Sequence, residues 1–401
     1  MRHRLVVVVA IAAILGGLGV AAGARGAPPG RYIVVLKDSV TSPASVAHAH
    51  AKAHRGQVGF VYSAAIKGYS ATLSTAAVGA LRADPQVAAV VADREVHLAA
   101  QTLPTGINRV DGERSSTVSG NGSGSVNVDI AIIDTGIDTS HPDLNVVGGV
   151  ACNGSGYRDG HGHGTHVAGI AAARDNSTGV VGVAPGARLW AVRVLSASGS
   201  GSWSNVICGV DWVTRNAARI EVANMSLGGS GSEPSGAGCL TGDALHDAVC
   251  RSVAAGVTYT VAAGNSSANA RGFVPAAYDE VITVSSLADF NGRAGGGAAA
   301  TCRSDTDDTL ANSSNYGSDV DLIAPGVCIS STYLGGGYRT LSGTSMASPH
   351  VAGAAALYRA AHPGVSPSQV KAALRTAANL NWNNVDDPDG IKERLLNVDA
   401  L

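Results

Sequence analysis

The stretch Leu341-Ser-Gly-Thr-Ser-Met-Ala-Ser-Pro-His350 places Ser345 among small residues, directly before an apolar run that predicts a helix. Two further segments make Ser345 more than an isolated serine. Ile132-Ile-Asp-Thr-Gly-Ile-Asp138 puts Asp134 at the end of an apolar strand, and His161-Gly-His-Gly-Thr-His-Val-Ala-Gly169 puts a histidine at the start of a helix. The chain therefore carries a carboxylate, an imidazole and a hydroxyl in the order Asp, His, Ser.

Serine is a poor nucleophile at neutral pH, so acyl transfer needs a nearby base and a third group that orients that base. Asp134, His163 and Ser345 can fill these roles. Chain order separates unrelated enzymes, because α/β-hydrolases run Ser, Asp, His and chymotrypsin-type proteases run His, Asp, Ser. Here the order differs from both, and Gly343-Thr-Ser-Met-Ala347 lacks the second glycine of a Gly-x-Ser-x-Gly elbow.

At these residues the chain resembles the subtilisin-like serine proteases, over roughly residues 100 to 380. The resemblance implies Asp134 as the orienting carboxylate, His163 as the general base and then acid, and Ser345 as the nucleophile. The family pattern His-Gly-Thr-His-Val-Ala-Gly assigns the base to His163 and not to His161 or His166.

Two more blocks extend this resemblance, Val261-Ala-Ala-Gly-Asn265 and Asn224-Met-Ser-Leu-Gly-Gly229. The first implies that Asn265 donates to the developing oxyanion, alongside the backbone N–H of Ser345. The second is similar to the family's substrate-binding strand, whose edge an extended peptide joins by backbone hydrogen bonds. The substrate-binding residues so implied are Ser226, Leu227, Gly228, Gly229, Ala262, Ala263 and Gly264.

Each block has a simpler interpretation when taken alone. The Ser345 segment could be an ordinary helix cap, and Asp134 and Asn265 could be turn residues. Three histidines within six residues suggest a metal site, but they lack the His-Glu-x-x-His spacing. Five blocks in register favour catalysis. An esterase, active on short acyl esters but not on casein, and an inactive peptide-binding pseudopeptidase remain as alternatives.

Composition limits the class of protein. With 401 residues and 45% apolar content, the chain can bury a large core and has room for more than one domain. A net charge of −2 gives no indication of a nucleic-acid partner. Abundant glycine and only 14% charged residues suit a compact, loop-rich extracellular protein.

The N-terminus predicts export. Arg2 and Arg4 precede an apolar run over 5–22, which ends in the small-residue stretch Ala22-Gly-Ala24. This pattern is typical of a secretory signal peptide, here residues 1–24; a membrane anchor is the alternative. We therefore expect a secreted, extracellular protein with no membrane association after signal removal.

Six cysteines, all after residue 150, are an even number in an apparently exported chain. That favours three disulfides, for which 15 pairings are possible. We favour the sequential pairing because the last two pairs each lie within one local insertion. The pairs are then Cys152 with Cys208, Cys239 with Cys250 and Cys302 with Cys328. No Cys-x-x-Cys spacing occurs, which argues against zinc.

The chain divides near residue 100. Before it, strands are predicted at 31–37, 68–73 and 87–91 and helices at 46–55 and 75–83, which suits a small α+β module. This module, residues 25–99, resembles the family's inhibitory propeptide; an independent N-terminal domain is the alternative. Cleavage is expected between His97 and Gln101, with Ala99-Ala100 the favoured bond.

Residues 100–401 alternate strands and helices, so we expect one doubly wound, mostly parallel α/β domain with its catalytic residues at the carboxyl ends of the strands. The expected strands are 126–133, 189–194, 220–225, 257–261, 281–284 and 320–323, and the expected helices are 164–174, 204–218, 244–255, 345–361 and 367–378.

The resemblance also implies structural calcium, although no cofactor for catalysis. The spacing between His163 and Pro185 equals that of bacterial subtilisins with a calcium loop. The implied ligands are oxygen atoms, which Ca²⁺ prefers. They are the side chains of Gln101, Asp143 and Asn176 and the backbone carbonyls of Arg174, Thr178 and Val180. An ordinary Asn-Ser-Gly turn is the alternative.

The chain departs from the simplest family members in three places. One insertion between Gly229 and Asn265 carries two cysteines, and a glycine-rich one over 291–309 carries three aspartates; either could shape substrate access or an ion site. The segment between Asn265 and Pro275 is short and would line the specificity pocket. We expect a monomer that cleaves proteins and peptides after apolar or small residues and is inhibited by its own propeptide.

Overall fold

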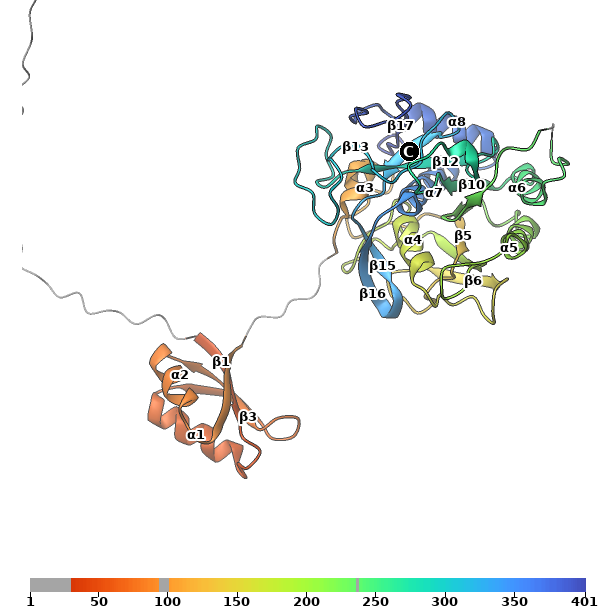
Figure 1. Ribbon diagram of the computed structural model, residues 1–401. Helices are drawn as coiled ribbons and strands as arrows, with labels where there is room; N and C mark the ends of the chain where they lie inside the picture. The colour runs from red at the N-terminus through yellow and green to blue at the C-terminus, as the bar shows by residue number, and fades with distance from the viewer. Residues whose placement is uncertain (1–29, 94–100, 236–237) are drawn as a thin grey trace, which may run out of the picture. The chain divides into compact units, whose positions relative to one another are not determined.

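The computed structural model describes residues 30–93, 101–235 and 238–401. The expected signal peptide and the Ala99-Ala100 bond lie outside these residues. The chain forms two compact units, Met1–His97 and Leu98–Leu401 (Figure 1).

The N-terminal unit is a four-stranded antiparallel sheet with two helices, as expected for an α+β module. The strands are β1 (Gly30–Leu36), β2 (Gln57–Tyr62), β3 (Gly68–Leu73) and β4 (Val87–Ala92), in the order β2-β3-β1-β4. Helix α1 (Pro43–His54) packs on β2 and β3, and α2 (Thr75–Arg82) packs on β4. Ser42 and Ser74 cap these helices by accepting backbone N–H groups. Strand β2 was not predicted, because this edge strand is largely exposed and lacks a buried apolar face.

The second unit is built on a nine-stranded sheet, which confirms the α/β prediction. Its order is β17-β14-β12-β10-β8-β5-β7-β6, all parallel, with β13 added antiparallel to β12. After β5 the chain runs to β6 and β7 on one side, and then returns to β8 on the other. Ligands bind at such a reversal of strand order, beyond the carboxyl ends of the strands. The strands are β5 (Asp129–Asp134), β6 (Val146–Ala151), β7 (Arg188–Arg193), β8 (Val222–Met225), β10 (Thr258–Ala262), β12 (Ile282–Ala288), β13 (Thr309–Leu310), β14 (Leu322–Pro325) and β17 (Arg394–Leu395).

Helices cover both faces of this sheet, so its central strands are buried on both sides. On β5, Ile130 and Ile132 belong to the core cluster of α4, α7 and α8, whereas Ala131 and Ile133 belong to that of α5 and α6. This alternation follows from the two-residue repeat of a strand. The helices are α3 (Thr105–Arg109), α4 (His163–Ala172), α5 (Trp203–Arg215), α6 (Ala244–Ala254), α7 (Thr344–Ala361) and α8 (Pro367–Ala377).

Several strands were missed from the sequence. Strand β6 lies at the sheet edge and contains two glycines, and β13 and β17 have two residues each. Two small sheets were also missed: β9 (Gly229–Ser230) pairs with β11 (Phe273–Val274), and β15 (Ile329–Tyr333) pairs with β16 (Gly337–Leu341). Short or polar strands of this kind carry no long apolar run.

The cysteines pair sequentially, as favoured above. Cys152 joins Cys208, Cys239 joins Cys250 and Cys302 joins Cys328, with Cα atoms 5.9, 5.3 and 5.8 Å apart. Within the residues that the structure describes, no helix is long and apolar enough to cross a membrane.

Two aspartates of the 291–309 insertion hold the backbone of the loop. Asp307 accepts the backbone N–H groups of Phe290 and Ala298 at 2.8 and 2.9 Å, and Asp308 accepts that of Gly295 at 2.7 Å. These hydrogen bonds satisfy backbone donors in a glycine-rich segment that has little regular structure.

Candidate active site

A buried carboxylate and a histidine meet at the carboxyl end of β5. Asp134 is the last residue of β5 and is fully buried, and His163 is the first residue of α4. The His163 Nδ1 atom lies 2.8 and 2.9 Å from the two carboxylate oxygens of Asp134. Gly164 makes this approach possible, because a Cβ atom there would collide with the carbonyl oxygen of Gly136.

The surroundings of His163 favour its protonated form. Burial by itself lowers the pKa of the imidazole. The charge and hydrogen bond of Asp134 and the charge of Asp159 raise this pKa by a larger amount, so the net shift is upward. A histidine held this way keeps one ring orientation and presents Nε2 as the outward-facing nitrogen.

Ser345 lies in the first turn of α7 and is linked to Ser226, which follows β8. Its hydroxyl donates to the Ser226 carbonyl at 3.3 Å, and the Ser226 hydroxyl donates to the Ser345 carbonyl at 2.8 Å. Pro349 explains the second bond, because it has no N–H for the carbonyl four residues earlier. Ser226 supplies the missing donor.

A buried amide extends this link into the sheet. Asn224, on β8, is fully buried; its amide donates to the Ser226 hydroxyl at 2.9 Å, and its oxygen accepts from Ser348 at 2.7 Å and Thr260 at 3.0 Å. These bonds join β8, β10 and α7 behind Ser345. Sequence reasoning missed this role of Asn224, because nothing in a local pattern distinguishes a buried asparagine from a turn residue.

Asn265 follows β10 and lies beside the start of α7. Its side-chain oxygen accepts the Thr344 backbone N–H at 2.8 Å and the Thr344 hydroxyl at 3.1 Å. With the oxygen engaged, the amide group is the free end of this exposed side chain. Gly343, at φ 142°, adopts a backbone conformation that favours glycine directly before this contact.

The other two histidines of the motif have different surroundings. His166 is fully buried, and its Nε2 contacts the carbonyls of Ile329 at 3.1 Å and Arg339 at 2.8 Å, which ties α4 to the β15–β16 hairpin. Burial lowers the pKa of His166 to about 4, so the ring is neutral. The ring of His161 lies 6.3 Å from that of His163.

Asp159 organises the turn that leads into α4 and was not singled out from the sequence. Its carboxylate accepts the backbone N–H groups of His161, Gly162 and Thr165 at 2.8 to 2.9 Å, together with two threonine hydroxyls. The only indication in the sequence would have been the position of this aspartate four residues before the candidate base, and such a spacing is a weak signal.

A cavity of about 770 Å³ opens beside His163. Its walls come from Ser226 to Gly229, from the loop over 198–202 and from Trp203. The strand register places Val261 opposite Met225, so Ala262 ends β10, and Ala263 and Gly264 follow it, next to the point where Ser226 follows β8. The residues expected to bind substrate therefore lie at neighbouring strand ends.

The expected calcium ligands also lie together. Asp143 accepts from the Asn176 amide at 2.7 Å and from the Val180 N–H at 3.0 Å. The Gln101 amide donates to the carbonyls of Arg174 at 2.8 Å and Val180 at 3.3 Å, and the Thr178 N–H donates to Asn176 at 2.7 Å. Burial raises the pKa of Asp143, which is the effect expected of a carboxylate placed away from water.

Comparison with known proteins agrees with this geometry. Residues 125–391 match the Subtilase family of peptidases, and residues 31–99 match the peptidase inhibitor I9 family. The chain belongs to the subtilase family. The match to the inhibitor family confirms the expected propeptide.

Relatives and solved structures extend over most of the chain. Subtilisin J from Geobacillus stearothermophilus is 38% identical over 96% of this chain and 93% of its own length. Subtilisin DY from Bacillus licheniformis is 43% identical over 75% of this chain and 99% of its own length. The crystal structure of a cold adapted subtilisin-like serine proteinase superposes with a TM-score of 0.58 at 37% identity, covering 73% of this chain and 97% of that one.

The chain is thus a subtilisin-like serine endopeptidase with an inhibitor-type propeptide. This decides against the esterase and the inactive peptide-binding protein that the sequence had left open. Subtilisins need no cofactor for catalysis.

Proposed function

We propose that Asp134, His163 and Ser345 are the catalytic triad of this endopeptidase. The observation that carries the proposal is the 2.8 Å contact between the buried Asp134 carboxylate and His163 Nδ1. Asp134 fixes the tautomer, so that His163 Nε2 accepts the Ser345 proton as the hydroxyl attacks the substrate carbonyl. His163 then returns the proton to the leaving amine, and water hydrolyses the acyl-enzyme by the same path.

The 3.3 Å contact of the Ser345 hydroxyl with the Ser226 carbonyl does not oppose this role. Catalytic hydrogen bonds are often loose without substrate and tighten in the Michaelis complex. A rotation about the Cα–Cβ bond of Ser345 changes the partner of its hydroxyl without moving α7.

Ser345→Ala tests the triad. The variant is expected to lose casein hydrolysis and to accumulate as unprocessed precursor, because the three residues act as a unit whose loss costs a subtilisin about 10⁶ in turnover. Ser342→Ala, three residues upstream, is the matched control and should remain active. Casein hydrolysis by Ser345→Ala at the wild-type rate would refute the assignment.

Asn265 is proposed to stabilise the oxyanion, together with the backbone N–H of Ser345. Asn265→Ala should lower kcat by about 10²–10³ with little change in KM, as is typical when a subtilisin loses one such donor, because the charge exists only in the transition state. A rise in KM at constant kcat would make Asn265 a substrate-binding residue instead.

The specificity pocket proposed from Ser226 to Gly228 and Ala262 to Asn265 contains no charged residue. It supports broad cleavage after apolar or small residues. A panel of peptides that differ only at the residue before the cut tests this, and a strong preference for Arg or Lys there would overturn the pocket assignment.

Export and autoprocessing are proposed from the sequence and the relatives. Residues 1–24 would be removed on secretion, and the enzyme would then cut between His97 and Gln101, preferentially at Ala99-Ala100. In support, Gln101 and Thr102 donate backbone N–H groups to Ser177 at 3.2 Å and Gly179 at 2.7 Å, so the chain is anchored on the catalytic unit from Gln101 onward. N-terminal sequencing of the secreted protein tests both steps.

Structural calcium and a monomeric state complete the proposal. The set around Asp143 offers one carboxylate, two side-chain amides and three backbone carbonyls, a donor set that suits Ca²⁺. Rotation of the Gln101 and Asn176 amides by 180° would turn their oxygens toward the ion.

A further inference from the structure

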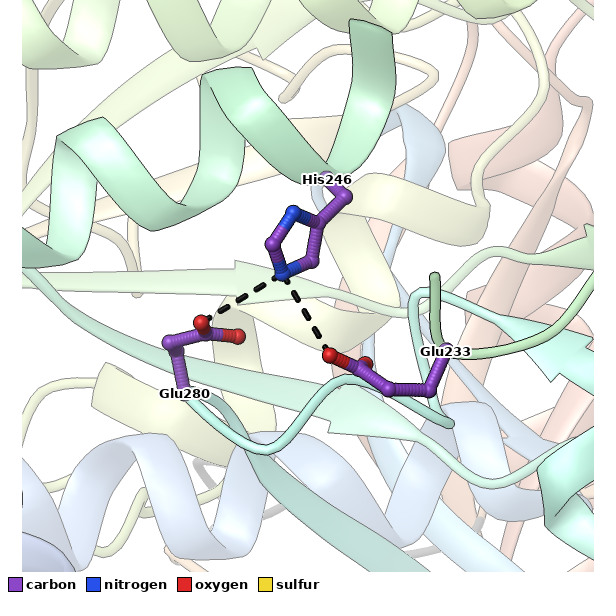
Figure 2. A group of neighbouring side chains, drawn as sticks. All are labelled: Glu233, His246 and Glu280. Carbon is purple, nitrogen blue, oxygen red and sulfur yellow. Dashed lines mark ion pairs between the residues drawn. The ribbon is translucent and has the colours of Figure 1, made fainter. Parts of the chain in front are cut away.

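A histidine and a glutamate of the insertion that follows the substrate-binding strand meet a second glutamate from the segment before β12 (Figure 2). His246 comes from α6, Glu233 from the segment after β9, and Glu280 from the segment before β12. The His246 side chain is 2% exposed, and those of Glu233 and Glu280 are 37% and 27% exposed. The cluster is therefore buried on the histidine side and open to solvent on the carboxylate side.

The distances within the cluster suit metal ligands better than hydrogen bonds. His246 Nε2 lies 3.3 Å from Glu280 Oε1 and 3.5 Å from Glu233 Oε1, and it has no hydrogen-bond partner among the described residues. Hydrogen bonds of this type are about 2.7–3.2 Å long. Two donors that each bind a tetrahedral Zn²⁺ at about 2.0–2.1 Å lie about 3.4 Å apart.

The other ring nitrogen of His246 faces Thr241 and Asp247. Its Nδ1 lies 3.3 Å from the Thr241 hydroxyl and 3.5 Å from Asp247 Oδ1. Asp247 is itself held by the Thr241 N–H at 2.8 Å and hydroxyl at 2.9 Å. A histidine that ligates a metal almost always directs its second nitrogen at a carboxylate, carbonyl or water, which leaves the first nitrogen's lone pair for the ion.

We propose that Glu233, His246 and Glu280 bind a Zn²⁺ ion, with water as the fourth ligand. The imidazole ligand favours zinc over calcium, which takes six to eight oxygen atoms. The missing Cys-x-x-Cys spacing concerns only cysteine-ligated sites. The ion would tie the segment after β9 to the segment after β11, the strand that pairs with β9. Because Gly229 on β9 lines the active-site cavity, zinc would stabilise this wall of the cleft.

Calorimetric titration of ZnCl₂ into the processed, metal-depleted enzyme, inactivated by a serine-directed inhibitor and saturated with Ca²⁺, tests the proposal. We expect one Zn²⁺ per chain and a melting temperature that rises on zinc addition. Glu280→Gln should weaken binding by at least about tenfold, and Asp247→Asn by about 10–100-fold. Asp279→Asn is the matched control, since it removes the same charge from the exposed residue next to Glu280, and it should bind as the wild type does.

Casein hydrolysis before inactivation reports whether each variant is folded, and Glu280→Gln keeps the shape of the side chain. Wild-type enzyme that binds no Zn²⁺ at about 100 μM would overturn the proposal and leave the cluster as an ion-paired histidine. Equal affinity of the wild type, Glu280→Gln and a His246→Gln variant would overturn it as well.

Discussion

At the scale of single residues, the active site depends on polar partners that lie behind the reacting groups. Pro349 removes one helical hydrogen bond from the first turn of α7, and the Ser226 hydroxyl replaces it. The same hydroxyl accepts from Asn224. The proposed nucleophile is therefore joined by two hydrogen bonds to Ser226, a residue proposed to bind substrate, so a change in this wall of the cleft reaches Ser345 directly.

Asp159→Asn is expected to move the acid limb of the pH profile of kcat/KM to lower pH. His163 acts as a base only when unprotonated, so activity is lost as the pH falls through its pKa, which Asp159 helps to raise. Removing that charge lowers the pKa of His163. Asp138→Asn, a change at another buried carboxylate nearby, is the control and should leave the limb unmoved. If the acid limb of the kcat/KM profile does not move in Asp159→Asn, Asp159 only shapes the turn that leads into α4.

The proposed reacting groups could be singled out from the sequence, but the residues that support them could not. Asp134, His163, Ser345 and Asn265 stand in local patterns that tie residue type to a strand end or a helix start. Asn224 and Asp159 act through contacts with distant or backbone groups, so their role depends on the folded chain. The cluster of Glu233, His246 and Glu280 could not be predicted from local patterns either, because its members come from three separate segments.

At the scale of elements, the accuracy of prediction followed the length of the apolar run. Strands β5, β7 and β10 carry apolar runs that are wholly or partly buried, and all three were predicted. The β15–β16 hairpin was missed, because β16 reads Gly-Tyr-Arg-Thr-Leu and is mostly exposed. Its position is set by His166 of α4, a contact that no periodicity reveals.

Chelation of calcium is expected to lower the melting temperature of the inhibitor-treated enzyme and to speed self-digestion of the active one. An ion that binds only the folded state stabilises it by about 2.7 kcal/mol at 100 times its Kd. Asp143→Ala should abolish the response to chelator. Asp175→Asn changes a neighbouring carboxylate that accepts the Gly120 and Gly122 N–H groups, so it should lower the melting temperature but keep the response. If the chelator leaves the melting curve of the wild type unchanged, the 174–180 segment is an ordinary turn and binds no calcium.

At the scale of the catalytic unit, buried charges hold together parts of the chain that are far apart in sequence. Arg109 of α3 pairs with Asp289 after β12 at 2.7 Å and with Asp308 of the insertion at 2.5 Å, and it donates to the Asn381 carbonyl at 2.5 Å. The three charged side chains are at most 4% exposed. One arginine therefore joins the beginning, the middle and the end of the catalytic unit.

Arg109→Met is expected to reduce the free energy of unfolding by about 3–5 kcal/mol, because it leaves two carboxylates buried without their cation. Arg114→Met removes an arginine whose side chain is 64% exposed and pairs with Asp399 at 3.3 Å, so it should cost less than about 1 kcal/mol. Denaturant unfolding of the inhibitor-treated variants measures both. Equal losses would show that the Arg109 ion pairs add nothing beyond a surface pair.

The stability of the whole catalytic unit should also depend on Glu393, next to the edge strand β17. Burial, together with the charges of Asp387 and Asp389, raises the pKa of Glu393 to about 8. A carboxyl group whose pKa is higher in the folded chain than in the unfolded one favours folding in its protonated form. Its contribution is therefore lost as the pH rises from the unfolded value near 4.5 through about 8.

Glu393→Gln is accordingly expected to raise the melting temperature at pH 9, where wild-type enzyme must ionise this buried group, and to change it little at pH 5, where the folded wild type keeps the proton. The difference between the folded and unfolded pKa of Glu393 corresponds to a few kcal/mol of stability at most. For a domain of this length, that is several degrees in melting temperature. Asp211→Asn, at a surface ion pair whose carboxylate is 57% exposed, controls for the loss of a negative charge and should show no such pH dependence. Calorimetry of the inhibitor-treated proteins with saturating calcium separates this effect from ion loss and self-digestion. A Glu393→Gln enzyme less stable than wild type at pH 9 would mean that the ionised carboxylate has a favourable partner.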